Sequence, residues 1–145
     1  MNVVVMGCGR VGARVASILD HGGHNLSVID LTSRSFQRLA PEFTGDTVIG
    51  TGIDEDVLRS AGIERADVFI AVTDSDNRNI FAGQVARAMF NVPQVIMRIY
   101  DPVREDTYRR LGFATVCPTT TVSALIIDTV VKSTEPASPD ASKGR

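Results

Sequence analysis

A glycine-rich turn near the start of the chain has the residue types and spacing that bind the phosphates of a dinucleotide. It reads Gly7-Cys8-Gly9-Arg10-Val11-Gly12, follows a run of valines and opens a segment with helical periodicity. Gly7 permits a tight turn, Gly9 leaves room for a pyrophosphate beside the backbone, and Gly12 lets the helix pack closely on the strand. A helix that begins here directs its free amides and positive dipole end at the phosphates. The same glycines could also serve only to build a tight strand-to-helix turn.

Asp30 strengthens the nucleotide interpretation because it ends the second apolar run, 26–29. At this distance from the glycine turn, a carboxylate accepts hydrogen bonds from the hydroxyls of an adenosine ribose. It would also repel a 2′-phosphate, so Asp30 favours NAD or an adenosine nucleotide over NADP. Arg34, four residues later, would weaken this preference.

Further polar residues follow the other predicted strands. Thr73 and Asp74 come after the fourth strand and should face the glycine turn. Asp76, in the same loop, fits equally well as the N-cap of the next helix or as a ligand contact. Thr51 stands between two glycines after the third strand, where the chain either approaches a base closely or simply turns.

Two arginines and one cysteine belong to the same candidate site. Arg98 ends an apolar run in a strand that should be buried, so its guanidinium needs an anionic partner: a phosphate, Asp74 or Asp101. Arg10 could clamp a terminal phosphate, reach a neighbouring subunit or lie in solvent. Cys8 occupies a position that calls for a small residue, and it would be redox-sensitive if the helix N-terminus lowered its thiol pKa.

The elements that must position these residues alternate along the chain, since short β-branched runs are followed by helical segments throughout. This pattern predicts an α/β fold, a Rossmann-like, doubly wound parallel six-stranded sheet with helices on both faces. The expected order 3-2-1-4-5-6 puts the ligand crevice outside the carboxyl ends of the first and fourth strands. The predicted strands are 2–6, 25–30, 47–49, 67–72, 94–98 and 115–117, and the predicted helices are 10–21, 33–39, 54–61, 77–90, 103–111 and 121–131.

Length and composition limit the classes of protein that this chain can belong to. The 145 residues have 43% hydrophobic content and a formal net charge of −2, which suits one domain of 1–132. Residues 133–145 are polar, contain two prolines and are predicted to be a disordered tail. The balanced charge argues against nucleic acid as a partner. Two cysteines, no leader before the first strand and no long apolar stretch predict a cytoplasmic protein with no direct membrane insertion.

The residues give little support to a catalytic function. No Ser-His-Asp, Cys-His or paired-carboxylate arrangement emerges, and His21 and His24 fall at the far end of the first helix. Hydride transfer also requires a substrate region, usually a second domain of ~100 residues. We therefore predict a non-enzymatic nucleotide sensor that changes the state of a partner. The alternatives are an NAD-dependent oxidoreductase subunit lacking its substrate domain and a scaffold that binds no nucleotide.

Motifs distributed over about residues 1–131 resemble the N-terminal nucleotide-binding domain of Trk-type potassium-uptake regulators, the KTN or RCK (TrkA-N-like) family. The resemblance implies a cytoplasmic regulatory subunit, held at the inner face of the membrane by its partner, that gates a membrane potassium transporter. It implies NAD or NADH as the ligand, with ATP or ADP as the alternative. Besides the glycine turn and Asp30, the motifs are 56–63, Ala66-Asp67, Ala71-Val72-Thr73, Asn79-Ile80, Arg98, Gly112 and Pro118.

The resemblance also implies roles for individual residues. Arg10 matches an arginine that reaches the terminal phosphate in triphosphate-binding members. Members pair through the last helix of this domain, here 121–131, which predicts a homodimer and allows a larger ring. The sequence departs from the family at 50–52, where many members have Gly-Asp or Gly-His, and it does not include the usual C-terminal ligand-binding domain. From the residues and the resemblance together, the predicted nucleotide contacts are Gly7, Cys8, Gly9, Arg10, Val11, Gly12, Asp30, Thr51, Thr73, Asp74 and Arg98.

Overall fold

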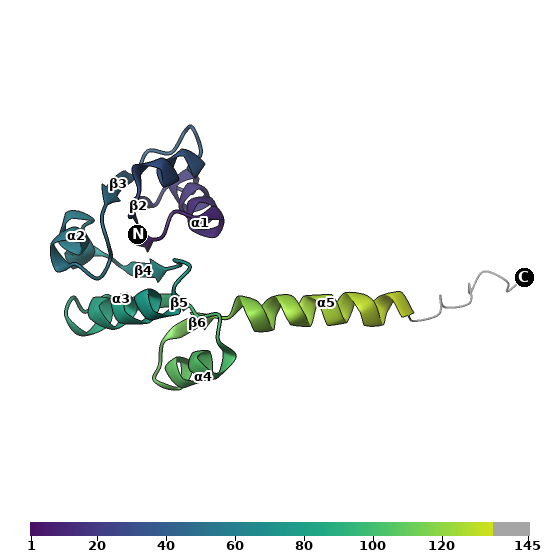
Figure 1. The fold of residues 1–145 in the computed structure, drawn as a ribbon. Coiled ribbons are helices and arrows are strands. Elements are labelled where there is room, and N and C mark those ends of the chain that lie inside the picture. Colours follow the sequence, from purple (N-terminus) through teal and green to yellow (C-terminus); the bar gives the residue numbers. More distant parts are fainter. Residues whose placement is uncertain (135–145) are drawn as a thin grey trace, which may run out of the picture.

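The computed structural model describes residues 1–134 and contains one six-stranded parallel sheet (Figure 1). The strand order β3-β2-β1-β4-β5-β6 confirms the predicted topology. The strands are β1 (Asn2–Met6), β2 (Asn25–Asp30), β3 (Asp46–Ile49), β4 (Val68–Ala71), β5 (Gln94–Arg98) and β6 (Ala114–Val116). The helices are α1 (Arg10–His21), α2 (Glu55–Ser60), α3 (Asp76–Ala88), α4 (Pro102–Arg110) and α5 (Pro118–Thr134), with short 3₁₀ helices η1 (Ser33–Arg38) and η2 (Ile63–Arg65).

Two hydrophobic clusters hold the sheet between layers of helix. On one face, α1 and η1 pack over side chains from β1, β2 and β4, with Val5 and Val28 fully buried. On the other face, α2, η2 and α3 pack over a larger cluster built around Phe69 and Met97. Central strands β1 and β4 are buried on both sides, as their continuous apolar runs predict for a parallel sheet.

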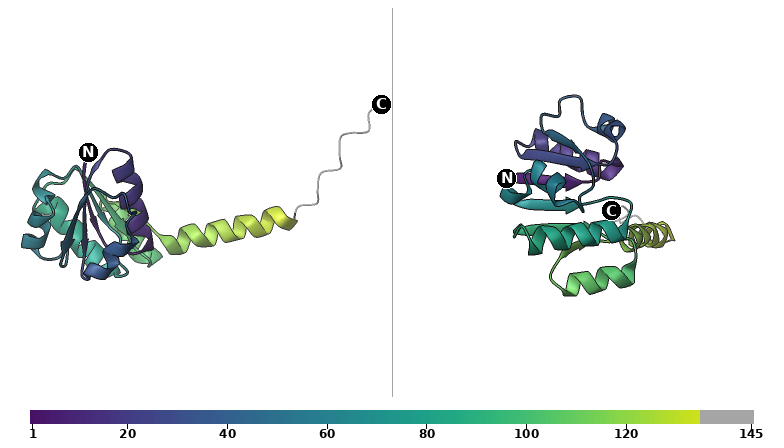
Figure 2. Two further views of the ribbon diagram at one scale, coloured as in Figure 1. Left: turned by 90° about the horizontal axis from the view of Figure 1, so that it is seen from above. Right: turned by 60° about the vertical axis from the view of Figure 1, so that its left-hand side comes forward.

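The part of the first face formed by β5 and β6 has no helix over it among the described residues. Ile96 is half-buried beside the α1 cluster, and in the parallel register it lies opposite Ala114. Ala114 and Val116 share this face and are exposed, Val116 by 50%. Helix α5, the next element, does not fold back over them but extends away from the domain (Figures 1 and 2).

Two predicted elements differ from the structure. The segment predicted as a helix over 33–39 is the 3₁₀ helix η1 (Ser33–Arg38), in the connection between the neighbouring strands β2 and β3. Phe36 and Leu39, three residues apart, both pack on the α1 cluster, as the three-residue repeat of a 3₁₀ helix allows. Helix α5 begins three residues before the predicted start, at Pro118, since proline suits the first position of a helix.

Most of the C-terminal segment that is predicted to be a disordered tail, 133–145, lies outside the residues that the structure describes. Helix α5 runs to Thr134, and the rest of the predicted disordered tail, 135–145, lies outside the described residues. The boundary of the domain at residue 132 stays a prediction. Within residues 1–134, no helix combines the length and apolar character needed to cross a bilayer.

Candidate functional site

A cavity of about 350 Å³ lies at the carboxyl ends of β1 and β4, where the sequence predicts the ligand crevice. Its walls come from the β1–α1 turn, the end of β2, the loop after β3 and the β4–α3 loop. Eight of the predicted contacts line it: Gly7, Cys8, Gly9, Asp30, Thr51, Thr73, Asp74 and Arg98. With Arg98 at the end of β5, the topology therefore brings residues from five separate segments of the chain to one place.

The glycine turn has the geometry that its spacing predicts. Gly7 adopts a φ of +107°, and an added Cβ there would stand 2.9 Å from the backbone of Thr73. A Cβ on Gly12 would overlap the Gly7 carbonyl oxygen, so Gly12 fixes the close packing of α1 on the turn. Gly9, the N-cap residue of α1, has open space around it and no side chain caps the helix. The first amides of α1 are thus available to an anion.

Asp30 joins the end of β2 to the glycine turn. Its Oδ2 accepts a hydrogen bond from the Cys8 amide at 2.8 Å, and its Oδ1 accepts one from the Thr32 amide at 3.1 Å. Burial alone would raise the pKa of Asp30, but these hydrogen bonds outweigh it and hold the pKa below its usual value. Asp30 is therefore a fixed carboxylate with lone pairs left for ribose hydroxyls.

Cys8 is a buried thiol rather than a reactive thiolate. Its Sγ donates to the Ser35 carbonyl at 3.4 Å. Burial and the Asp30 carboxylate raise its pKa to about 11, against a smaller opposing effect of Arg38. The hypothesis of a redox-sensitive Cys8 with a lowered pKa is therefore wrong, because desolvation and a neighbouring anion outweigh the helix N-terminus.

Among the described residues Arg98 pairs with neither Asp74 nor Asp101, two of its three expected partners; the third, a phosphate, stays a prediction. One of the terminal nitrogens of Arg98 donates to the Val72 and Thr73 carbonyls, each at 2.8 Å. Its guanidinium also stacks 5.0 Å from the ring centre of Tyr100. Its Nε is buried and has no hydrogen-bond partner among the described residues. A buried cationic donor without a partner is costly unless a ligand supplies an acceptor.

Asn79 organises the β4–α3 loop beside Arg98, a role that reasoning from the sequence missed. Its fully buried side chain accepts hydrogen bonds from the Thr73 amide and hydroxyl, at 2.9 and 2.6 Å. Its Nδ2 donates to the Thr73 and Arg98 carbonyls at 3.0 and 2.9 Å. A polar residue among the apolar residues of α3 was the available signal. Asn79 thereby links the ends of β4 and β5.

Asp76 is not the N-cap of α3, which was one of its two predicted roles, and its role as a ligand contact stays a prediction. The N-cap of α3 is Ser75, whose hydroxyl accepts from the Arg78 amide at 3.3 Å. Asp76 instead accepts from the amides of Tyr100 and Asp101, at 2.8 and 3.1 Å. It therefore fixes the loop after β5 and does not line the cavity.

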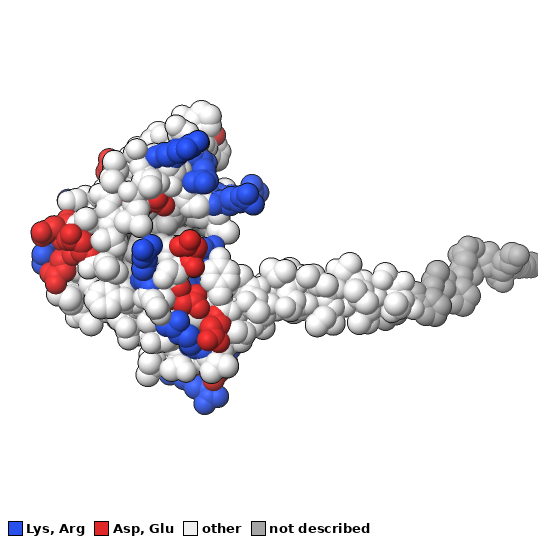
Figure 3. Space-filling model, in the orientation of Figure 1, with Lys and Arg blue, Asp and Glu red and all other residues white. Residues whose placement is uncertain are grey.

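The remaining predicted contacts lie outside the cavity lining. Gly12 is buried against the turn, and Val11 is half-exposed on α1. Arg10 is exposed and lines a separate groove along α1 with Arg14 and Arg38. Figure 3 shows basic side chains gathered over this α1 and η1 side of the molecule.

Two unpredicted cations, Arg38 and Arg78, line the cavity instead. Arg38 comes from η1, which the sequence suggested was an ordinary helix, and Arg78 from the first turn of α3. No group of three or more His, Cys, Asp or Glu side chains within residues 1–134 is arranged to hold a metal ion. The charged groups of the cavity are thus three arginines and two carboxylates.

Comparison with known proteins identifies the type of domain. The model of the TrkA-N domain matches residues 3–119. The Trk system potassium uptake protein TrkA of Streptomyces coelicolor is 53% identical over 116 residues, which cover 80% of this chain and 52% of that protein. This chain therefore spans about half the length of that relative.

Solved structures with the same fold include a TrkA-N domain and parts of a channel that was solved with NAD and with ADP. The TrkA-N domain of the inner membrane protein ybaL of Escherichia coli superposes with a TM-score of 0.75 at 21% identity, covering 92% of this chain and 96% of that one. The GsuK channel bound to NAD superposes with a TM-score of 0.72 at 25% identity, covering 90% of this chain and 23% of that one. GsuK bound to ADP superposes with a TM-score of 0.73 at 25% identity, covering 92% of this chain and 34% of that one.

Proposed function

This chain belongs to the TrkA-N domain family, and we propose that it is the nucleotide-sensing part of a potassium uptake system. It binds NAD or NADH, with ATP or ADP as the alternative, in the cavity at the ends of β1 and β4. The single observation that carries this proposal is the buried, unpartnered Nε of Arg98 in a cavity that also holds the open Gly9 backbone and the Asp30 carboxylate. The GsuK channel, part of which has the same fold, was solved with NAD, and this supports the ligand class.

Each segment around the cavity has a part in this binding. The amides at the start of α1 hold the pyrophosphate beside Gly9, since nothing of this chain fills that space. Asp30 accepts the ribose hydroxyls with the lone pairs that Cys8 and Thr32 leave free. Thr51 borders the adenosine side, and Thr73 with Asp74 borders the other side. Arg98 adds positive charge near the phosphates.

A second copy of the chain completes the domain through α5. The apolar residues of this helix are half-exposed or more, and the side visible in Figure 3 carries no charged group. The uncovered β5–β6 face offers a matching apolar surface around Ile96 and Val116. Unpartnered apolar surfaces of this kind mark interfaces. We therefore propose a homodimer in which α5 of each copy contacts the other; its exposed apolar residues are Val122, Leu125, Ile126, Ile127, Val130 and Val131.

The proposed output is regulation rather than chemistry. The cavity offers two carboxylates, three arginines and the Cys8 thiol, whose pKa is raised to about 11, and no histidine is among the residues that line it. A nucleotide that binds one arrangement of the dimer more tightly would shift the population of a membrane potassium transporter bound to it. The proposed location is the cytoplasmic face of the membrane, and the relative named as a Trk system potassium uptake protein supports this partner.

Calorimetric titration with NAD, NADH, ATP and ADP tests the ligand. We expect saturable binding to the unaltered chain and a loss of about tenfold or more in Asp30→Asn, because a neutral amide cannot accept both ribose hydroxyls as a carboxylate does. Asp56→Asn, which removes an exposed carboxylate on α2, is the matched control and should bind normally. No binding to a folded chain would reject the sensor. NADH oxidation with a small carbonyl substrate would favour the oxidoreductase.

Binding to the chain and regulation of transport are separate steps and need separate measurements. Potassium uptake into cells that carry the transporter should respond to the chain, and the response should change with Asp30→Asn. Arg10 provides a sharper test of nucleotide choice, since it lies outside the cavity of its own copy. If Arg10 reaches a terminal phosphate across the dimer, Arg10→Ala should weaken ATP more than NAD. Equal losses would remove that role.

A further inference from the structure

An open groove of about 730 Å³ runs along α1, between this helix and the segment that follows η1. We call it the α1 groove. Arg10, Arg14 and Arg38 line it, and all three are exposed. Within residues 1–134, none of these arginines forms an ion pair. On α4, by contrast, Arg109 pairs with Asp106 at 2.6 Å. The positive charge of the α1 groove is therefore left for a partner.

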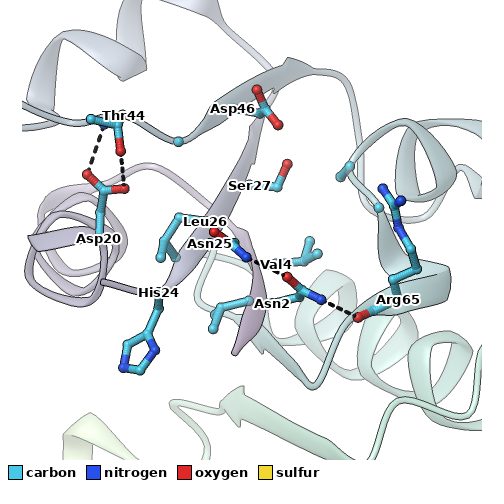
Figure 4. Close-up of a pocket in the computed structure, with 14 residues that line it drawn as sticks. Asn2, Val4, Asp20, His24, Asn25, Leu26, Ser27, Thr44, Asp46 and Arg65 are labelled. Atoms are coloured by element: carbon cyan, nitrogen blue, oxygen red, sulfur yellow. Dashed lines mark hydrogen bonds between the residues drawn. The ribbon is translucent and has the colours of Figure 1, made fainter. Parts of the chain in front are cut away.

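Three carboxylates lie between residues 10 and 42 of the sequence, and only one of them lines the α1 groove. Asp20, on α1 itself, faces Thr44, which donates to both of its oxygens at 2.9 Å each (Figure 4). Asp30 lines the nucleotide cavity instead. Glu42 is left as the single acidic residue beside three arginines. The α1 groove is thus basic on a chain whose formal net charge is −2, and such an uneven distribution steers an acidic partner to one surface.

The uncharged residues of the α1 groove are small or apolar. Ala13 is buried, and Ser17 and Ala40 are half-buried, so small side chains leave the space between α1 and the next segment open. The Ser17 hydroxyl is already engaged, since it accepts from the Ala40 amide at 3.0 Å. Ile18 is 58% exposed beside them. A concave surface with an apolar part and several arginines fits a segment of another protein, whereas a bilayer presents a flat layer of headgroups.

Arg38 belongs to both the α1 groove and the nucleotide cavity. One of its terminal nitrogens lies 3.5 Å from the Cys8 carbonyl oxygen, in the glycine turn. This distance is long for a hydrogen bond, so the guanidinium is held weakly. Helix α1 is shared as well, since its first amides face the proposed pyrophosphate position and its outer side forms the groove. Anions bound at the two places therefore draw on the same positive charge.

We propose that the α1 groove docks an acidic segment from the cytoplasmic side of the partner transporter. Carboxylates of that segment pair with the three arginines, and a neighbouring apolar side chain packs on Ile18. A nucleotide in the cavity weakens the docking, because its phosphates take up the charge of Arg38. The coupling is reciprocal, so the docked segment weakens nucleotide binding by the same factor. The docking surface is independent of nucleotide, whereas its response to nucleotide and the choice of partner rest on the proposed function.

The probe is a fluorescent peptide that repeats Glu-Glu-Leu-Leu, and its counterpart repeats Gln-Gln-Leu-Leu. Anisotropy is measured with the full chain at low salt, where charge pairs are least screened. We expect saturable binding of the acidic peptide and binding about tenfold or more weaker for the glutamine peptide. Arg14→Glu should weaken the acidic peptide by about tenfold, and Ile18→Ser by about threefold. Arg65→Glu, the same charge reversal at an exposed arginine of η2, is the matched control and should bind normally.

Saturating NAD or ADP should weaken the acidic peptide by about fivefold or more in the unaltered chain and by less than about twofold in Arg38→Gln. A peptide affinity that ignores a bound nucleotide overturns the coupling.

The remaining outcomes separate the docking surface from the nucleotide site. A folded chain that binds nucleotide but not the acidic peptide overturns the docking surface and leaves the sensor intact. A chain that binds the peptide but no nucleotide supports the docking surface and rejects the sensor. Equal peptide affinity in Arg14→Glu and Arg65→Glu places the peptide elsewhere and overturns the proposal. So does Arg14-dependent binding to phosphatidylglycerol vesicles without peptide binding, or loss of a dimer in Arg14→Glu, since these assign the groove to lipid or to a second copy.

Discussion

The two halves of the sheet are covered by helices to different degrees. Strands β1 to β3 are covered on one face by α1 and η1, and their glycine turn, Asp30 and Cys8 hydrogen-bond to one another within the chain. Strands β5 and β6 have an uncovered face, and the helix that follows them extends away with its apolar side chains exposed (Figure 2). The nucleotide cavity draws on both parts of the sheet, since Arg98 reaches it from β5, whereas the uncovered β5–β6 face is the surface that we propose a second copy covers.

The difference suggests how binding is coupled to assembly. Asn79 and Arg98 connect the two halves, since both contact the end of β4 from α3 and β5. A ligand that pairs with the buried Nε of Arg98 would therefore act on the strand whose outer face, at Ile96, belongs to the proposed dimer surface. We propose this as the physical link between the nucleotide cavity and the second copy.

The largest effect should come from the glycine turn itself. Gly12→Val places its side chain on the Gly7 carbonyl oxygen, and we expect a loss of more than about 3 kcal/mol of stability or no folded protein. Gly9→Ala is the matched substitution, because nothing lies within 4 Å of its added Cβ. It should melt normally and bind NAD at least about tenfold more weakly. Thermal melting and calorimetry separate the two outcomes, and a stable Gly12→Val would contradict the packing role.

The second prediction concerns the incomplete half. Ile126→Glu puts a charge on the exposed apolar side of α5, and in a dimer that charge would be buried without a partner. Sedimentation should change from dimer to monomer, with a dissociation constant raised about 100-fold or more. The melting temperature should also lose its dependence on protein concentration. Asp128→Asn, on the same helix, should remain dimeric; a monomeric unaltered chain would refute the proposed interface.

The fold was predictable because its signals are local. Four element ranges, 2–6, 10–21, 25–30 and 94–98, match the structure residue for residue, since β-branched runs, a glycine turn and clear periodicity mark them. The strand order follows from the general rules for βα units. Helix η1 was harder to predict because Phe36 and Leu39 suit either an α-helix or a 3₁₀ helix.

The site was predictable in its backbone and less so in its side chains. Glycine spacing and strand ends correctly place Asp30, Thr73 and Arg98 around one cavity. The partners of Arg98 were not predictable, because the carbonyls of Val72 and Thr73 carry no mark in the sequence. The buried network of Asn79 depends on side-chain directions that only the packed sheet defines.

Arg98 allows the link between the two halves to be measured. Arg98→Lys keeps the charge but loses the planar fork that reaches Val72 and Thr73, and Arg98→Met keeps only the aliphatic stem. We expect both to bind NAD about tenfold or more weakly, and Arg98→Met to lose about 1–3 kcal/mol of stability by leaving carbonyls unpaired. Arg109→Met, exposed on α4, is the control. Full NAD affinity in Arg98→Lys would show that charge alone is enough.

The smallest effect concerns Cys8 and appears only at high pH. Its pKa is raised from 9.0 to about 11 in the folded protein, so the folded state holds its proton where the unfolded state releases it. The resulting stability is fully present below pH 9 and is lost as the pH rises toward 11. Melting temperatures should therefore fall over that range more in the unaltered chain than in Cys8→Ala. Iodoacetamide should label Cys8 far more slowly at pH 8 than it labels unfolded chain, and rapid labelling of the folded chain would mean that this half of the sheet opens readily.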